Sequence, residues 1–242
     1  MAHRIFLAGA AGVVGQRLTP LLLAAGHRVA GTTRSPEKAQ ALARQGVEPV
    51  VVDVFDADRL AQCVAAFRPD IVIHQLTDLP RGLDPALMAE AGRRNARIRT
   101  DGTRNLMAAA LAAGVRRFIA QSIAWIYAPG PTPHRENAPL DTRAEGARAV
   151  TIGGVVALEN AVLSTPPSLT GIVLRYGRFY GPGTGAETPP PGPRVHVDAA
   201  AHAALLALSA EARGIYNVAE PNDEVATAKA ERELGWRADF RR

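Results

Sequence analysis

Short apolar runs rich in β-branched residues alternate with helical patterns along the whole chain of 242 residues. Continuous apolar strands separated by helices are typical of a parallel sheet that is covered on both faces. The sequence therefore predicts a doubly wound α/β fold with about seven parallel strands. The expected strands are residues 4–8, 28–33, 49–52, 70–74, 116–122, 169–175 and 214–218, and the expected helices are residues 13–25, 36–45, 57–67, 85–113, 147–163, 198–210 and 225–235.

A glycine-rich turn, Gly9-Ala-Ala-Gly12-Val13-Val14-Gly15, connects the first expected strand to the first expected helix. The first glycine allows the tight turn, the second lets the backbone approach a pyrophosphate, and the third lets the helix pack closely on the strand. The N-terminus of the helix then offers free N–H groups and its positive dipole end to phosphates. Because the turn sits between a strand and a helix, it predicts a Rossmann-type dinucleotide-binding loop rather than three unrelated turn glycines.

The end of the second expected strand indicates which dinucleotide is bound. An acidic residue about 20 positions after the glycine loop would bind the ribose hydroxyls of NAD. Here the strand ends in Thr33-Arg34-Ser35, and Lys38 follows. A cation at this point suits the 2′-phosphate of NADP, although Ser35 is also a good helix N-cap and Arg34 could be an ordinary surface charge. We expect NADP, with NAD possible.

Further stretches match a known pattern. Val52-Asp53-Val54 follows the third expected strand and Gln75-Leu76-Thr77 follows the fourth. Together with residues 102–106, 174–183, 195–198 and 214–218, they resemble the extended short-chain dehydrogenase/reductases, the NAD(P)-dependent epimerase/dehydratase family, over nearly the whole chain.

That resemblance implies cofactor contacts at the ends of the third and fourth strands, and a homodimer paired through the helices at 85–113 and 147–163. The residues predicted to bind the cofactor are Gly9, Gly12, Val13, Val14, Gly15, Thr33, Arg34, Ser35, Lys38, Asp53, Val54, Gln75, Leu76, Thr77 and Gln121.

The resemblance also implies a Tyr-x-x-x-Lys pair, which this sequence lacks. In the family the tyrosine is the acid/base and the lysine lowers its pKa. The only two lysines, Lys38 and Lys229, have no tyrosine four residues before them. Alignment on Glu159 places Thr151 at the tyrosine position and Val155 at the lysine position. Neither side chain can transfer that proton near neutral pH.

Other residues are candidates for the chemistry. Ser122 lies one place from the family's catalytic serine position, and Tyr176 lies at the ligand end of the sixth strand. We take these two as the candidate catalytic residues. Arg99 stands three residues before Gly102, where the family has an asparagine. Further candidate proton donors, each with packing as the simpler explanation, are Tyr127, His134, Glu136 and Tyr180.

The net charge of +5 raises the question of nucleic-acid binding. The basic cluster between residues 93 and 104 has no interleaved aromatic residues and no helix-turn-helix or zinc pattern, so we expect no nucleic-acid partner. A positive field suits a small anionic ligand better. No metal-ligand spacing occurs, the lone Cys63 favours a reducing cytoplasm, and no run of 18 apolar residues predicts a membrane span.

Two Pro/Gly-rich stretches, residues 128–141 and 181–194, predict loops that overhang the ligand edge of the sheet. We expect a dinucleotide-binding domain at 1–175, completed by 195–220, and a reduced substrate-binding region at 176–194 and 221–242. The sequence predicts hydride transfer to or from a small carbonyl, alcohol or alkene. A catalytically silent dinucleotide sensor or partner protein, and a non-redox isomerase or cyclase, remain open alternatives.

Overall fold

The fold is a doubly wound parallel sheet, as the alternating sequence pattern predicts. The computed structural model describes residues 2–80, 84–209 and 211–242. Seven strands pair in the order β3-β2-β1-β4-β5-β6-β9, and every pairing is parallel. The strands are β1 (Arg4–Ala8), β2 (Arg28–Thr33), β3 (Glu48–Val51), β4 (Ile71–His74), β5 (Arg117–Ile123), β6 (Thr170–Tyr176) and β9 (Gly214–Val218).

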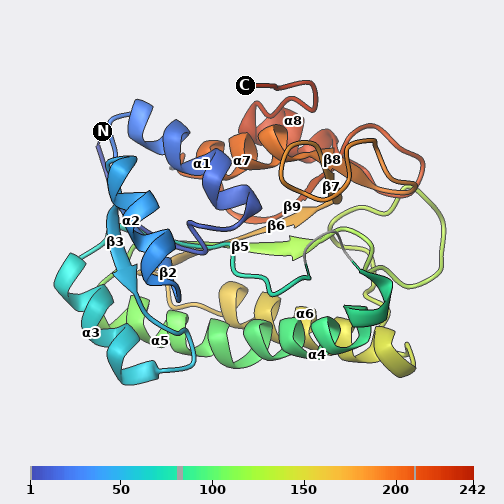
Figure 1. The fold of residues 1–242 in the computed structure, drawn as a ribbon. Coiled ribbons are helices and arrows are strands. Elements are labelled where there is room, and N and C mark those ends of the chain that lie inside the picture. The colour runs from blue at the N-terminus through green and yellow to red at the C-terminus, as the bar shows by residue number, and fades with distance from the viewer. Residues whose placement is uncertain (1, 81–83, 210) are drawn as a thin grey trace.

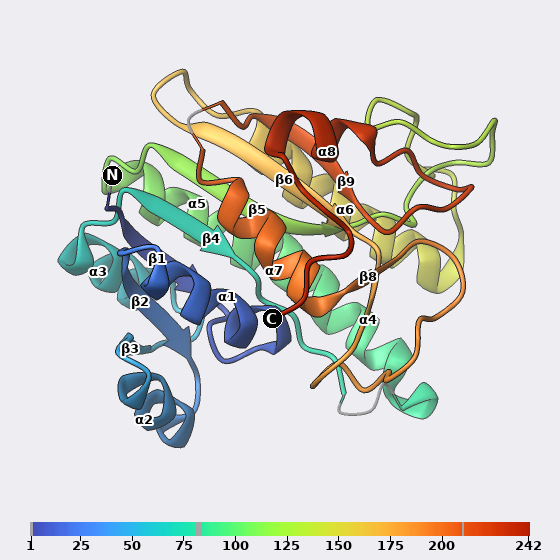
Figure 2. The ribbon, with the colours of Figure 1, turned by 90° about the horizontal axis from the view of Figure 1, so that it is seen from above.

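Helices cover both faces of this sheet (Figure 1). One face carries α1 (Val13–Ala24), α7 (Val197–Leu206) and α8 (Ala228–Leu234), and the other carries α3 (Ala57–Phe67), α4 (Met88–Arg97), α5 (Thr103–Ala112) and α6 (Gly146–Leu163). The helix α2 (Pro36–Arg44) lies at the β3 end of the sheet, as Figure 2 shows. Two apolar cores result, one on each side, because strands buried on both faces need a covering layer on each.

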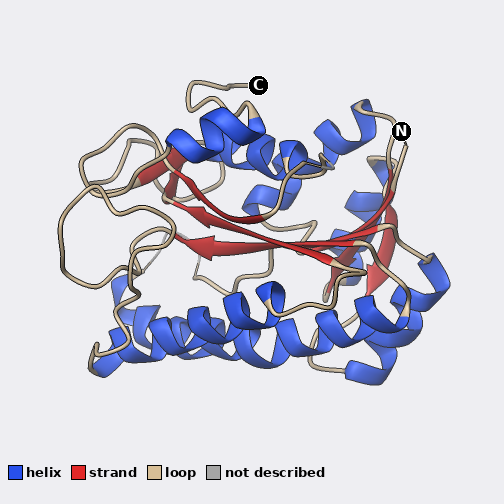
Figure 3. Ribbon diagram, turned by 180° about the vertical axis from the view of Figure 1, so that it is seen from behind, coloured by secondary structure: helices blue, strands red, loops and turns tan. Residues whose placement is uncertain are grey.

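The order of the strands reverses between β1 and β4. The chain moves outward from β1 through β2 to β3 and then returns to pair β4 on the other side of β1, with Ala8 opposite His74. Doubly wound proteins bind their ligands outside the carboxyl ends of the strands at such a reversal. The loops at 128–141 and 181–194 extend from the same end of the sheet (Figure 3), as the sequence predicts.

The expected long helix at 85–113 is divided into four parts. A 3₁₀ turn, η2 (Pro85–Leu87), leads into α4, and a π-helical segment, η3 (Ile98–Gly102), joins α4 to α5. The sequence pattern did not predict this π segment. Single π turns inside α-helices occur often at functional sites, because they turn one side chain out of the regular helical face.

A second, two-stranded parallel sheet pairs β7 (Arg178–Tyr180) with β8 (Arg194–His196), at the two ends of the 181–194 loop. Three-residue strands beside a Pro/Gly-rich loop leave too short a pattern for sequence to reveal. After α8, Trp236 is 1% exposed and donates its indole N–H to the carbonyl of Ala199 on α7 at 2.8 Å. The C-terminal segment is therefore packed on the main core, and its separate status as a substrate region stays a prediction.

Helix α6 is long and apolar enough to cross a membrane by length and composition alone, with a mean hydropathy of 1.3 over 18 residues. The sequence did not single out this helix, because scattered polar and glycine residues interrupt its apolar run. In the structure α6 packs against α4, β5 and β6, and its buried Glu159 is ion-paired inside the protein. Its apolar character follows from that packing, while the absence of a membrane span stays a prediction. Val150 on α6 and Met88 on α4 are exposed apolar residues, and pairing of two copies through these helices also stays a prediction.

Candidate cofactor and active site

The glycine turn has the backbone geometry that a phosphate loop requires. Gly9 has a φ of +94°, and its N–H donates to the hydroxyl of Thr32 on β2 at 3.1 Å. A Cβ at Gly9 would lie 2.7 Å from the carbonyl oxygen of Gln75, so only glycine fits between β1 and the end of β4. The turn closes with the N–H of Gly12 donating to the carbonyl of Gly9 at 3.0 Å.

Gly12 and Gly15 then bring helix α1 close to the turn. A Cβ at Gly15 would lie 2.2 Å from the carbonyl oxygen of Gly9, so this glycine permits close helix–loop contact. Gly12 is the N-cap of α1, no side chain caps the helix, and no acidic residue lies in its first turn. The N–H groups and the positive dipole end are therefore available to an anion.

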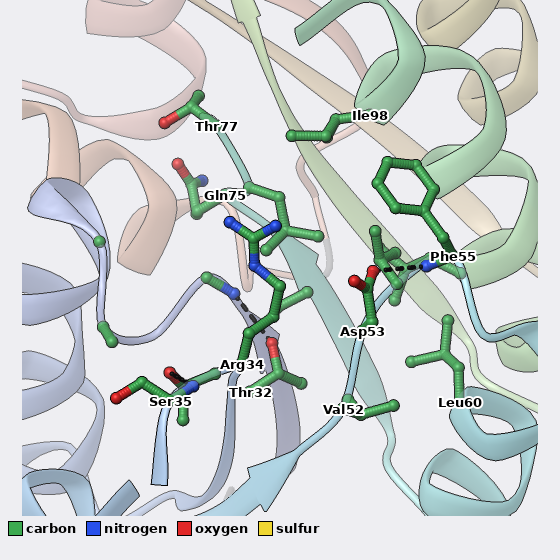
Figure 4. A pocket seen from close by; sticks show the side chains of 18 of the residues that line it. Thr32, Arg34, Ser35, Val52, Asp53, Phe55, Leu60, Gln75, Thr77 and Ile98 are labelled. Carbon is green, nitrogen blue, oxygen red and sulfur yellow. Dashed lines mark hydrogen bonds between the residues drawn. The ribbon is translucent and has the colours of Figure 1, made fainter. Parts of the chain in front are cut away.

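A cavity of about 330 Å³ opens beside this turn (Figure 4). Eleven of the residues predicted to bind the cofactor line it: Gly9, Gly12, Thr33, Arg34, Ser35, Lys38, Asp53, Val54, Gln75, Leu76 and Thr77. Four predicted residues do not line it. Val14 and Gly15 are buried in α1, Val13 is the first residue of that helix, and Gln121 lies within β5.

The wall beyond β3 combines one carboxylate with an aromatic ring. Asp53 follows β3, and its side chain accepts the N–H of Phe55 at 2.9 Å, which fixes the turn. The guanidinium of Arg97 lies 4.1 Å from the centre of the Phe55 ring. The side-chain amide of Asn105 donates to the carbonyl of Val54 at 3.0 Å. This turn is thus held by α4 and α5, and presents an acid and an apolar surface suited to a nucleoside.

Arg34 extends across the cavity toward Gln75 (Figure 4). Its guanidinium lies 3.7 Å from the carboxylate of Asp78, and its side chain is 62% exposed, so the contact is weak. Ser35 caps α2: its hydroxyl accepts the N–H of Lys38 at 3.2 Å and donates to Glu37 at 2.5 Å. The capping alternative considered for Ser35 is therefore confirmed, while Arg34 keeps a guanidinium available in the cavity.

Two buried polar side chains, those of Gln75 and Tyr176, lie close to each other at the ends of β4 and β6. Gln75 lines the cavity, whereas Tyr176 does not. Among the described residues, the Gln75 amide and the Tyr176 hydroxyl make no hydrogen bond of normal geometry, and at most a poorly aligned one with each other, although both side chains are almost completely buried. Burial raises the pKa of the Tyr176 phenol, and the nearby Gln75 amide offsets part of that rise. Poorly paired buried polar groups are costly, so the Gln75 amide, which lines the cavity, fits a ligand that supplies hydrogen bonds, as the carboxamide of a nicotinamide would.

Ser122 belongs to a buried ion-pair network. Its hydroxyl donates to Glu159 on α6 at 2.7 Å. The guanidinium of Arg175 on β6 donates two hydrogen bonds to the same carboxylate, at 2.9 and 2.6 Å. Ser122 is 1% exposed and does not line the cavity. The hydroxyl is thus committed to Glu159 and holds α6 against the sheet. Its proposed catalytic part stays a prediction that this geometry does not favour.

The other candidate proton donors extend the same network. The phenol of Tyr127 donates to Asn217 at 2.6 Å and accepts from Arg175 at 2.8 Å. Burial raises the pKa of Tyr127, and the adjacent guanidinium opposes the rise. The ring of His134 stacks on Tyr127 at 5.0 Å, and the Glu136 carboxylate accepts the N–H of Asn217 at 3.1 Å. These contacts fasten the 128–141 loop to β9. The fourth candidate, Tyr180, hydrogen-bonds Glu220 instead.

No acid/base pair stands at the positions aligned with Tyr-x-x-x-Lys. Val155 is fully buried in a small apolar cluster with Ile123, Ile126 and Ile152, and the hydroxyl of Thr151 donates to the carbonyl of Ala147 at 3.2 Å. Among the described residues, no group of three His, Cys, Asp or Glu side chains could hold a metal ion. The positions aligned with the Tyr-x-x-x-Lys pair therefore hold no acid or base, and the apolar cluster around Val155 does not line the cavity.

Sequence reasoning missed several cavity residues that no short motif marks. Phe55, Leu60, Ile98 and Leu106 form its apolar walls, and Thr32 supports the glycine turn. Their positions depend on how α3 and the π segment fold back over the sheet. Two of them left a signal: Thr32 is the neighbour of Thr33 at the end of the second expected strand, and Leu106 ends the 102–106 stretch that resembles the family.

Comparisons with known proteins agree with this geometry. The NAD(P)H-binding family matches residues 9–150, and the chain belongs to that family. A relative from Streptomyces sp, named 3-diazoavenalumate denitrifying reductase, is 40% identical over 246 aligned positions that span 93% of this chain and 78% of the relative.

Solved structures show the same fold at low identity. The UDP-glucose 4-epimerase of Thermus thermophilus, in complex with NAD, superposes with a TM-score of 0.73 at 22% identity, covering 97% of this chain and 84% of that one. Pal from Bacillus thuringiensis superposes with a TM-score of 0.79 at 18% identity, covering 98% and 95%. The family match confirms the expected nicotinamide dinucleotide cofactor, and the solved structures confirm that the chain shares the fold of epimerase/dehydratase-type short-chain dehydrogenase/reductases.

Proposed function

We propose that this protein is an NAD(P)H-dependent reductase that directs a hydride onto a small electrophilic substrate. The observation that carries the proposal is the cradle around the 330 Å³ cavity, where Gly9, Gly12 and the start of α1 leave room for a pyrophosphate. Asp53 and Phe55 would hold the nucleoside, and Gln75 would meet the nicotinamide end. When bound, the reduced cofactor supplies a hydride.

The missing proton relay favours a substrate that needs no proton. A carbonyl group that accepts a hydride must also accept a proton, and this chain lacks the Tyr-x-x-x-Lys pair that supplies one. An arenediazonium carbon needs none, since Ar–N₂⁺ + H⁻ → Ar–H + N₂ balances in atoms and charge. The Streptomyces relative is named for a diazo compound and for the loss of its nitrogen. We therefore propose a diazo-type aromatic electrophile as the substrate class, in place of a carbonyl, alcohol or alkene.

The test is a reduction assay with 4-deuterated NADPH and NADH and an ortho-hydroxyarenediazonium salt. We expect oxidation of the reduced nicotinamide well above the rate without protein, release of dinitrogen, and deuterium at the carbon that carried the diazo group. Heat-denatured protein controls for the spontaneous reaction. Cofactor binding without any acceleration would contradict the reductase function and favour the catalytically silent sensor instead.

Arg34 is proposed to select NADP over NAD, because it places a cation where the 2′-phosphate would lie. We expect Arg34→Asp to weaken NADPH binding by about 30-fold or more, and to change NADH binding by less than about threefold. Arg28→Asp is the matched control, since Arg28 starts the same strand, is also exposed and has Glu48, at 3.7 Å, as its one ion-pair partner among the described residues. Fluorescence titration measures both affinities. Equal losses for the two cofactors would mean that Arg34 is only a surface charge.

A further inference from the structure

Arg99 is a partly buried guanidinium without a hydrogen-bond partner among the described residues. It lies in the π-helical segment η3, directly after Ile98, whose side chain points into the cofactor cavity (Figure 4). Two other guanidiniums near the ends of β4 and β6, those of Arg94 and Arg175, each have a carboxylate within 4 Å. For Arg99 no hydrogen bond and no ion pair of that length occurs within the described part of the chain.

The charges around Arg99 leave one positive charge uncompensated. Its guanidinium interacts electrostatically with Glu159, but Arg175 and Ser122 already occupy that carboxylate. The charge of Arg99 also acts on His74, whose pKa burial lowers to about 3, so this imidazole is neutral. Two guanidinium groups therefore share one carboxylate, which leaves a net charge of +1.

Burial removes water from the charged guanidinium of Arg99, which costs free energy. Burial lowers the pKa of Arg99 to about 10, which leaves the group charged near neutral pH. Unlike the enclosed side chains of Gln75 and Tyr176, its nitrogen atoms are not fully shut off from solvent. An anion that can approach such a desolvated charge forms strong charge-assisted hydrogen bonds with it and offsets the lost hydration.

The position of Arg99 identifies which ligand brings that anion. His74 ends β4, and its imidazole shares a hydrogen bond of 3.1 Å with the hydroxyl of Thr103, the residue that follows η3. The π segment that carries Arg99 therefore lies beside the carboxyl end of a central strand, where doubly wound enzymes do their chemistry. The phosphates of a dinucleotide would lie at the glycine turn of β1, served by the start of α1. The anion that meets Arg99 therefore belongs to the substrate.

We propose that Arg99 is the anion-binding residue of the substrate site, and that the substrate carries one carboxylate. A single fork of guanidinium N–H groups matches one carboxylate in a bidentate pair, and one spare charge balances one negative charge. A phosphate, with a second charge and three oxygens, would need further donors. This inference rests on the proposed reductase function, because it assigns the substrate of that same site.

Equilibrium binding to the protein saturated with NADP⁺ tests the proposal. The probes are benzoate, phenylacetate and cinnamate, each compared with its uncharged amide in calorimetry and thermal-shift experiments. We expect the wild type to prefer the acids, and Arg99→Met to weaken acid binding by about 30-fold or more. Arg99→Lys should bind the acids with intermediate affinity, because lysine keeps the charge and loses the fork.

Arg104→Met is the matched control, because Arg104 lies five residues further on, is 70% exposed and pairs with Asp101. It should bind acids and amides like the wild type. Without ligand, Arg99→Met should melt at or above the wild-type temperature, because it removes a partly buried charge, so lost binding would not reflect misfolding.

The proposal is overturned if the wild type does not bind the acids, binds amides equally well, or keeps its acid affinity in Arg99→Met. It is also overturned if Arg99→Met loses NADP⁺ affinity in the same proportion, which would place Arg99 on the cofactor. Acid binding that depends on Arg99, without hydride transfer in the reduction assay, would contradict the reductase function alone.

Discussion

Replacing Gly15 with valine is expected to abolish dinucleotide binding and to lower the free energy of unfolding by about 3 kcal/mol. A Cβ at this position would lie 2.2 Å from the carbonyl oxygen of Gly9 and 2.6 Å from that of Ala10. Both obstacles are backbone atoms of the phosphate turn, so no side chain can rotate away. The turn and α1 must separate, which moves the N–H groups that would hold the pyrophosphate.

Gly153→Val is the matched control for that substitution. Gly153 lies on the exposed side of α6, where a Cβ meets nothing within 4 Å. The control should keep its NADPH affinity and be at least as stable as the wild type, because glycine is a poor helix former. Urea unfolding and fluorescence titration measure the two effects. If Gly15→Val bound NADPH within about threefold of the wild type, the glycine turn would not be the phosphate site.

The sequence predicted the fold well because two strong periodic signals agree. Buried parallel strands read as short apolar runs, and the covering helices read as amphipathic or apolar segments, so all seven strands of the main sheet were found near their observed positions. The pair β7 and β8 was not, since three residues beside proline and glycine carry too little pattern. The π segment also left no signal, because it depends on how α4 and α5 pack against α6.

The site could be predicted only where strand ends define it. Asp53, Gln75 and Arg34 follow strands whose carboxyl ends meet at one edge, so their residue types carried the information. Ser122 shows the limit of this reasoning. One step along an alternating strand changes the face of a side chain, and the structure points this hydroxyl at Glu159 rather than into the cavity. Arg99 was noticed only as a departure from a family pattern, and its missing partner needed the structure.

Replacing Glu159 with leucine is expected to lower the free energy of unfolding by about 4 kcal/mol, the largest loss we predict for a single side chain. The Glu159 and Arg175 side chains are 4% and 3% exposed, and their closest oxygen and nitrogen atoms lie 2.6 Å apart. Removing the carboxylate leaves the guanidinium buried with its charge uncompensated, and orphans the Ser122 hydroxyl as well. Arg232→Ala, which breaks an exposed pair with Glu233, should cost less than about 0.5 kcal/mol in the same urea unfolding experiment.

The sharing of Glu159 by two guanidiniums makes a second measurement decisive. Without the carboxylate, Arg99 and Arg175 both lose the acid that balances their charges, so removing either guanidinium should raise the stability of the Glu159→Leu variant. We therefore expect Arg99→Met to restore about 1 kcal/mol to Glu159→Leu, and Arg175→Met to restore more, because Arg175 is the more deeply buried. If Arg99→Met restored nothing in that background, Arg99 would not share this carboxylate. The spare positive charge assigned to the substrate would then have to be sought elsewhere.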